Sequence, residues 1–165
     1  MKNETNQDGG IPFYKIGTFG EKADAYISKE LFETYKTQYP YPKKGQVLIS
    51  AAGTLGKTVA FDGEPSYFQD SNIVWIDNDE SKILNAFLLW VMRFVDWSAY
   101  MTDGSVIPRI YNESLRSVTI PAPSISEQQR IVAQVEQYEA EIAKAQAVMA
   151  SCQQRKKDIL DKYLK

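Results

Sequence analysis

The sequence predicts an α+β domain, with mixed or antiparallel strands and a buried helix, followed by one long C-terminal coiled-coil helix. Up to residue 123, short β-branched and aromatic runs alternate with two helical segments. The composition then changes within residues 120–130, and neither glycine nor proline occurs from Glu127 to Lys165. With 165 residues, 44% apolar and 12% aromatic, the chain can bury a core. We therefore expect a domain of residues 1–123 and a helix of residues 124–165.

Five segments of the domain are rich in the side chains that suit a pleated, half-buried strand. They are residues 11–17, 46–53, 57–61, 71–77 and 117–121. Residues 28–39 and 80–97 instead predict helices. The second helix is apolar almost all round, so we expect it to be buried with the sheet wrapped around it. Residues 101–112 hold a glycine turn and a proline, and they predict a loop that exposes Ser105 and Arg109.

The final helix shows a heptad pattern. Ser126 and Gln129 have the spacing of a capping box that opens a helix. Apolar or small residues then recur at alternating intervals of four and three, with Lys156 at the one polar position of the series; they are Ile131, Val135, Tyr138, Ile142, Ala145, Met149, Cys152, Ile159 and Tyr163. The seam spans about five heptads on a helix of about 58 Å. The domain is too small to cover it, so we expect an antiparallel partner helix, with packing on the chain's own domain as the alternative.

Gly56-Lys57-Thr58 matches the end of a phosphate-binding P-loop. That loop needs glycine where this chain has Ala51, and it needs a helix directly after the lysine. Here "TVAF" and an Asp62-Gly63 turn follow, which is typical of a returning strand. We therefore predict a hairpin with its tip at residues 53–56, and not a nucleotide site.

The residue inventory excludes several chemistries. The chain has no histidine and a single cysteine, Cys152, so it lacks a disulfide framework, the usual zinc ligand sets and a Ser-His or Cys-His pair. Asp77, Asp79 and Glu80 form a polar run at the start of a predicted helix, where carboxylates favour the helix dipole. We predict no catalytic constellation, no metal and no cofactor. The N-terminus lacks a signal-peptide pattern and the apolar run 83–92 is too short to cross a bilayer, so we expect a reducing, cytoplasmic setting without membrane contact.

Charge does not by itself indicate a nucleic-acid partner. Residues 1–125 carry 12 basic and 15 acidic side chains, net −3, and residues 126–165 carry 7 and 6, net +1. DNA contact would need a local patch of lysine or arginine for phosphates, and of amide or guanidinium groups for base edges. The loop side chains that could supply it are Lys15, Lys43, Lys44, Ser50, Thr54, Lys57, Gln69, Ser71, Asn72, Ser105 and Arg109. Solvated loops are the simpler interpretation of these residues taken alone.

Four stretches resemble the target-recognition half of type I restriction-modification specificity subunits. They are "GQVLISAAGTLGKTVAF", "YFQDSNIVWI", "GSVIPRIYN" and, as the most specific element, "VTIPAPSISEQQRIV". The resemblance runs from about Ile11 to the C-terminus. It implies a non-catalytic subunit with two target-recognition domains, each reading half of a split DNA sequence, held apart by two long antiparallel helices. It also implies docking of an adenine-N6 methyltransferase subunit that uses S-adenosylmethionine, and through it an ATP-hydrolysing restriction subunit.

Carried over, residues 1–123 would read double-stranded DNA, and the helix from Ser126 would be the spacer and part of the docking surface. The chain has one domain and one helix where the family has two of each. It therefore looks like a half-subunit whose antiparallel homodimer reads a palindromic split site, or like a piece of a longer polypeptide. Two alternatives remain. One is a coiled-coil assembly protein that does not read DNA. The other is a nucleotide-dependent enzyme, which would be supported by ATP binding that Lys57→Ala abolishes.

Overall fold

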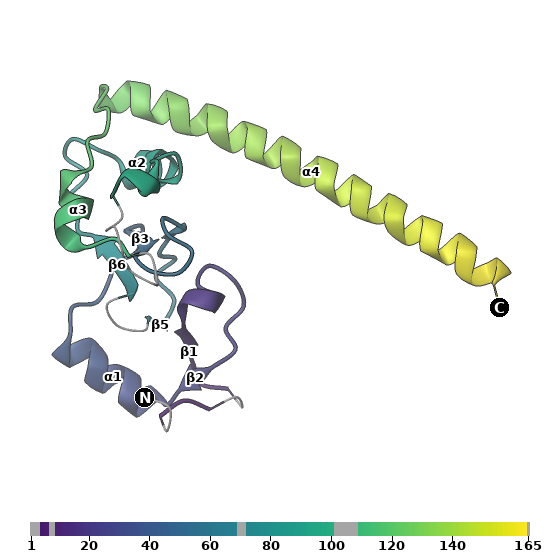
Figure 1. The fold of residues 1–165 in the computed structure, drawn as a ribbon, viewed down its shortest axis with the longest axis horizontal. Coiled ribbons are helices and arrows are strands. Elements are labelled where there is room, and N and C mark those ends of the chain that lie inside the picture. Colours follow the sequence, from purple (N-terminus) through teal and green to yellow (C-terminus); the bar gives the residue numbers. More distant parts are fainter. Residues whose placement is uncertain (1–3, 7–8, 69–71, 101–108, 165) are drawn as a thin grey trace. The chain divides into compact units, whose positions relative to one another are not determined.

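The computed structural model describes residues 4–6, 9–68, 72–100 and 109–164, and it contains two units, Met1–Ile125 and Ser126–Lys165 (Figure 1). In the first unit, one small sheet has the order β2-β1-β5. Strand β1 (Ile11–Tyr14) pairs antiparallel with β2 (Tyr26–Ile27) and parallel with β5 (Tyr67–Phe68). Aromatic side chains strengthen the β1–β5 ladder, because Phe13 stacks on Tyr67 and Tyr14 on Phe68 with ring centroids 6.1 and 5.7 Å apart.

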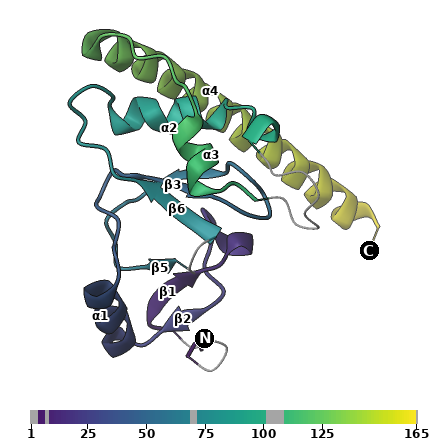
Figure 2. The same cartoon turned by 60° about the vertical axis from the view of Figure 1, so that its left-hand side comes forward.

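The second sheet has the order β4-β3-β6, and all its pairs are antiparallel. It consists of β4 (Thr58–Ala60), β3 (Val47–Ser50) and β6 (Ile73–Ile76). Figure 2 shows β3 and β6 of this sheet beside α2 (Asn85–Arg93) and α3 (Asn112–Ser117). The central strand β3 is buried on both faces. Val47 and Ile49 face one apolar cluster while Leu48 faces another, as the two-residue period of a strand requires.

Helices cover the sheets. Helix α1 (Lys29–Gln38) begins where the Ser28 hydroxyl accepts a bond from Leu31 N at 3.1 Å, and its Phe32 packs on the β2-β1-β5 sheet. Helix α2 (Asn85–Arg93) packs against β3 and β4. Two single-turn helices, η1 (Ile16–Thr18) and η3 (Trp97–Tyr100), and the short helix α3 (Asn112–Ser117) complete the unit.

Helix α4 (Ile125–Tyr163) forms the second unit as one continuous helix of 39 residues (Figure 1). At 1.5 Å per residue it is about 58 Å long. Every residue from Glu136 to Leu164 is exposed, including the seam residues Tyr138, Ile142 and Met149 and the free Cys152. Within the described residues, no helix has the length and apolarity to cross a membrane.

The predicted α+β fold with its long terminal helix is confirmed. Four predicted strands correspond to β1, β3, β4 and β6, and residues 28–39 correspond to α1. The strand predicted at 117–121 is wrong: Ser117 ends α3, and the residues after it, which lead to Pro121 and Pro123, have no regular structure. The two-residue strands β2 and β5 were missed because two residues show no periodicity.

Two helix boundaries also differ. The helix predicted over 80–97 is only Asn85–Arg93. Phe87 and Leu88 within it are buried, whereas Phe94 just beyond its end is 83% exposed. Of the carboxylates expected at its start, Glu80 accepts a bond from Asn85 N at 2.9 Å. Asp79 instead accepts bonds from Ser81, and these hold the pKa of the Asp79 carboxyl below its usual range. Helix α4 begins at Ile125, so Ser126 lies in its first turn.

Candidate nucleic-acid interface

The β3–β4 hairpin carries the Gly-Lys-Thr motif at its tip. Ser50 N donates to Lys57 O at 2.9 Å and Gly56 N donates to Ser50 O at 3.0 Å, which closes the turn. Gly53 and Gly56 have φ angles of +69° and +73°, in the region that favours glycine. Lys57 leads directly into strand β4, so the helix that a P-loop places after its lysine is replaced by a strand. The predicted hairpin is confirmed.

Ser50 shapes this tip from the inside. Its side chain is 1% exposed, and its hydroxyl donates to the carbonyl oxygens of Ala52, at 3.1 Å, and of Thr54. Because the hydroxyl is enclosed in this way, its burial counts against the predicted DNA contact of Ser50. Thr54, at the tip itself, is exposed.

Asn72 and Arg109 flank the end of β3. Ala51 N donates to Asn72 O at 2.8 Å, and Ile110 N donates to Ala51 O at 2.9 Å. Ala52 and Arg109 form an antiparallel bridge, and Arg109 Nη2 donates to Asn72 Oδ1 at 3.4 Å. An exposed guanidinium, an amide and the Thr54 hydroxyl are therefore brought to one end of a buried sheet, from three segments far apart in the sequence.

Two predicted lysines near the hairpin are paired with carboxylates. Lys57 Nζ lies 2.9 Å from Glu21 Oε1, and Lys15 Nζ lies 3.3 Å from Asp24 Oδ1. Residues 15–24, which include both carboxylates, run beside the hairpin. Ile16 of this segment packs so close to the tip that a Cβ added to Gly53 would lie 3.0 Å from Ile16 Cγ2. The charge of each lysine is thus balanced within the folded chain.

The remaining candidates lie elsewhere. Lys43 and Lys44 are exposed at the other end of β3, where Lys43 N donates to Gln46 Oε1 at 2.8 Å, so the strand separates them from the hairpin tip. Gln69, Ser71 and Ser105 lie outside the described residues.

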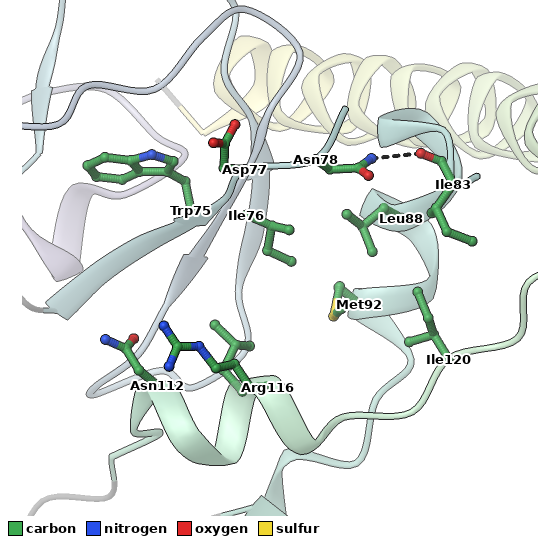
Figure 3. A pocket seen from close by; sticks show the side chains of 11 residues that line it. Trp75, Ile76, Asp77, Asn78, Ile83, Leu88, Met92, Asn112, Arg116 and Ile120 are labelled. Atoms are coloured by element: carbon green, nitrogen blue, oxygen red, sulfur yellow. Dashed lines mark hydrogen bonds between the residues drawn. The ribbon is translucent and has the colours of Figure 1, made fainter. Parts of the chain in front are cut away.

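A cavity of about 600 Å³ lies between β6, α2 and α3 (Figure 3). Its lining is apolar toward α2, through Leu88 and Met92, and polar toward α3 and the end of β6; the lining residues are Trp75, Ile76, Asp77, Asn78, Ile83, Leu88, Met92, Asn112, Leu115, Arg116 and Ile120. Asn78 Nδ2 donates to Ile83 O at 2.6 Å. The sequence did not predict this cavity, because its walls come from segments up to 45 residues apart, Trp75 to Ile120, with no shared pattern.

A second cavity, of about 390 Å³, is lined by aromatic and proline side chains; they are Tyr35, Tyr39, Pro40, Tyr41, Pro42, Tyr67, Phe68 and Trp75. The Tyr41 hydroxyl donates to Ser66 O at 2.7 Å, and burial raises the pKa of this phenol. The run Tyr39-Pro40-Tyr41-Pro42 is the sequence signal that could have indicated it. Among the described residues, no group of three His, Cys, Asp or Glu side chains is placed to hold a metal ion.

The sequence matches a family model described as a type I restriction modification DNA specificity domain over residues 1–148. It is 56% identical over 139 residues to the putative type I restriction enzyme specificity subunit S.HindORF215P of Haemophilus influenzae. The match covers 84% of this chain and 36% of that protein.

Two solved structures share the fold. One is described as "Structural basis underlying complex assembly and conformational transition of the type I R-M system"; it has a TM-score of 0.67 at 21% identity, over 92% of this chain and 36% of the other. The HsdS subunit from Thermoanaerobacter tengcongensis has a TM-score of 0.61 at 22% identity, over 87% and 34%. The chain spans about a third of the length of the proteins it matches.

Proposed function

The chain belongs to the type I restriction-modification DNA specificity family, and from this membership we propose that residues 1–123 read one half of a split DNA sequence. Helix α4 is then a spacer that pairs antiparallel with a second copy and forms part of the docking surface for an adenine-N6 methyltransferase. Through the methyltransferase, an ATP-dependent restriction subunit joins the complex. In this role the chain itself is not an enzyme.

One observation carries the proposal for DNA reading: Thr54, Asn72 and Arg109 converge at the exposed end of a buried sheet. Arginine pairs with two acceptors of guanine, and asparagine pairs with adenine, in the major groove. The backbone hydrogen bonds of Ala51, to Asn72 on one side and to Ile110 on the other, fix the backbone from which Asn72 and Arg109 project. A rigid scaffold that presents such groups together suits the reading of base edges.

Phosphate contacts are weaker in the isolated domain. Residues 1–125 have a net charge of −3, and Lys15 and Lys57 are each paired with a carboxylate. Because DNA affinity depends strongly on neutralised phosphates, much of that neutralisation must come from a partner. We expect weak or absent specific binding by the chain alone, and tighter binding once the methyltransferase is added.

Methylome sequencing of cells that express the chain with its cognate methyltransferase tests this proposal. We expect one split motif, palindromic if two copies of this chain pair. Arg109→Ala should weaken binding of that motif by about 10-fold or more, since one base contact is worth about 1–3 kcal/mol. Lys29→Ala, which removes a charge from an exposed position on α1, is the matched control and should bind as the wild type does. A reconstituted complex that binds every duplex equally contradicts the proposal.

The exposed apolar stripe of α4 also favours a second candidate, an assembly protein that pairs through the helix without reading DNA. In that case Arg109→Ala and Lys57→Ala would have no effect in any DNA assay, while helix pairing would persist.

A further inference from the structure

We propose that Arg109 reads a guanine, and that Asn72 is a positioning residue that orients the Arg109 guanidinium and does not itself contact a base. Guanine presents two acceptors, O6 and N7, in the major groove, and an edge of a guanidinium with two donors matches them. This inference rests on the proposed DNA reading. It deepens that proposal, because it names the base and gives the two side chains different roles.

Backbone contacts at the end of β3 hold both residues in place. Asn72 O accepts a bond from Ala51 N at 2.8 Å, and Arg109 pairs with Ala52 in an antiparallel bridge. Ile110 N donates to Ala51 O at 2.9 Å. Ala51 and Ala52 are 5% and 3% exposed, so the segment that joins the two residues is itself part of the core. The side chains of Asn72 and Arg109 therefore project from a fixed backbone.

The bond between the two side chains leaves Arg109 able to read a base. Arg109 Nη2 donates to Asn72 Oδ1 at 3.4 Å. A guanidinium is planar and carries five N–H donors in a fixed fork. The two hydrogens of Nη2 belong to different edges of that plane, one shared with Nη1 and the other with Nε. A single bond to Asn72 therefore leaves one complete edge of two donors, which is what guanine O6 and N7 require.

The same bond counts against Asn72 as a reader of adenine. To read adenine, the asparagine amide donates to N7 while its oxygen accepts from N6. The Asn72 oxygen already accepts from Arg109, so a base would have to share that oxygen with a cation. Asn72 is also half-buried, whereas Arg109 is exposed. Arg109 is therefore the more accessible of the two side chains to a base edge.

A neutral partner suits the orienting role. Lys15 and Lys57 are each paired with a carboxylate, which offsets the charge of the lysine. Arg109 bonds to an amide instead, and in the part of the chain that the structure describes no carboxylate forms an ion pair with it. Asn72 thus restrains the guanidinium without offsetting its charge, and a charged donor makes the stronger hydrogen bond.

Base substitutions test this in the complex of the full chain with the methyltransferase. The probes are a duplex carrying the motif returned by methylome sequencing, and duplexes in which one G·C pair of that motif is replaced by A·T. One such replacement should weaken binding of the wild-type complex by about 10-fold or more. In Arg109→Ala this penalty should disappear, while the preference at every other position of the motif stays as in the wild type.

Variants of Asn72 separate positioning from base reading. Asn72→Ala should lower the guanine penalty about threefold, because the guanidinium loses the acceptor that orients it. Asn72→Asp keeps an acceptor oxygen at the same reach but lacks the amide donor, so it should retain the penalty. In an Arg109→Ala background, Asn72→Ala should change no base preference. Gln38→Ala, the matched control, removes an exposed amide from α1 and should behave as the wild type.

Several results would overturn the inference while the wild-type complex still discriminates its motif. They are a motif in which no G·C pair depends on Arg109, an Arg109→Ala variant that weakens all duplexes equally as a lost phosphate contact would, a silent Asn72→Ala, and an Asn72→Asp that loses the penalty. A wild-type complex that binds every duplex equally overturns the proposed function itself, and this inference with it. Melting temperatures identify a variant that fails to fold, and if Asn72→Ala does so, Arg109→Ala and Asn72→Asp still decide the outcome.

Discussion

Two isoleucines show how differently the two units of the chain are stabilised. Ile49 in strand β3 is 0% exposed and packs with Val47, Leu88 and Met92 in one apolar cluster. Ile142 in helix α4 is 50% exposed. Both isoleucines belong to apolar patterns in the sequence: Ile49 to one of period two and Ile142 to one of heptad spacing. Of the two side chains, only Ile49 is fully buried.

Helix α4 is held along its exposed length by local interactions. Gln137 bonds to Glu141 at 3.1 Å and Gln154 bonds to Asp158 at 2.7 Å, both across four residues. Such pairs contribute about 0.2–0.5 kcal/mol each, far less than a buried apolar side chain. The first unit therefore has a closed apolar core of its own, whereas apolar side chains of α4 such as Tyr138, Ile142 and Met149 are exposed.

The largest expected effect comes from truncating the same side chain in the two units. Ile49→Ala should lower the free energy of unfolding of the first unit by about 2–5 kcal/mol, because it leaves a cavity in a closed core. Ile142→Ala, at concentrations where the chain is a monomer, should change stability by less than about 0.5 kcal/mol. Urea unfolding followed by Trp fluorescence and by circular dichroism measures both. Equal losses in the two variants would contradict the comparison.

A charged substitution on the stripe should break the proposed helix pair. Ile142→Glu places a carboxylate within an apolar seam, so we expect the dissociation constant of the homodimer to rise by about 10-fold or more. Ala143→Glu adds the same charge next to the seam, at another exposed position, and should have little effect. Sedimentation equilibrium at several concentrations measures the dissociation. A wild-type chain that stays monomeric at every concentration removes the basis of the dimer.

Local patterns in the sequence were enough to predict several elements. The β3–β4 hairpin followed from the strand-like residues after Lys57, and α4 followed from its heptad periodicity. These features depend on neighbours a few positions apart. For the same reason, strands β2 and β5, which owe their pairing with β1 to distant segments, gave no signal.

The candidate site was predictable in part. Residue type suggested Arg109 and Asn72, and the structure brings them within 3.4 Å of each other. Residue type also suggested Ser50, but burial depends on the surrounding fold, which encloses its hydroxyl. The pairing of Glu21 with Lys57 joins positions 36 residues apart, and no local pattern connects them. Long-range packing therefore decides which polar side chains remain available to a ligand.

The smallest expected effect concerns the first turn of α4. Glu127 accepts bonds from the Arg130 guanidinium, and these hold the pKa of the Glu127 carboxyl below its ordinary value of 4.5. A lowered carboxyl pKa stabilises the helix fully above the unfolded value, and the contribution is lost as pH falls through the lowered folded value. A carbon-detected NMR titration of the Glu127 carboxyl should therefore show a midpoint below 4.5, and Arg130→Gln should raise that midpoint toward 4.5. A midpoint that Arg130→Gln leaves unchanged would mean that the Glu127–Arg130 pair does not form in solution. The contribution of such side-chain pairs to the stability of α4 would then be smaller than the structure indicates.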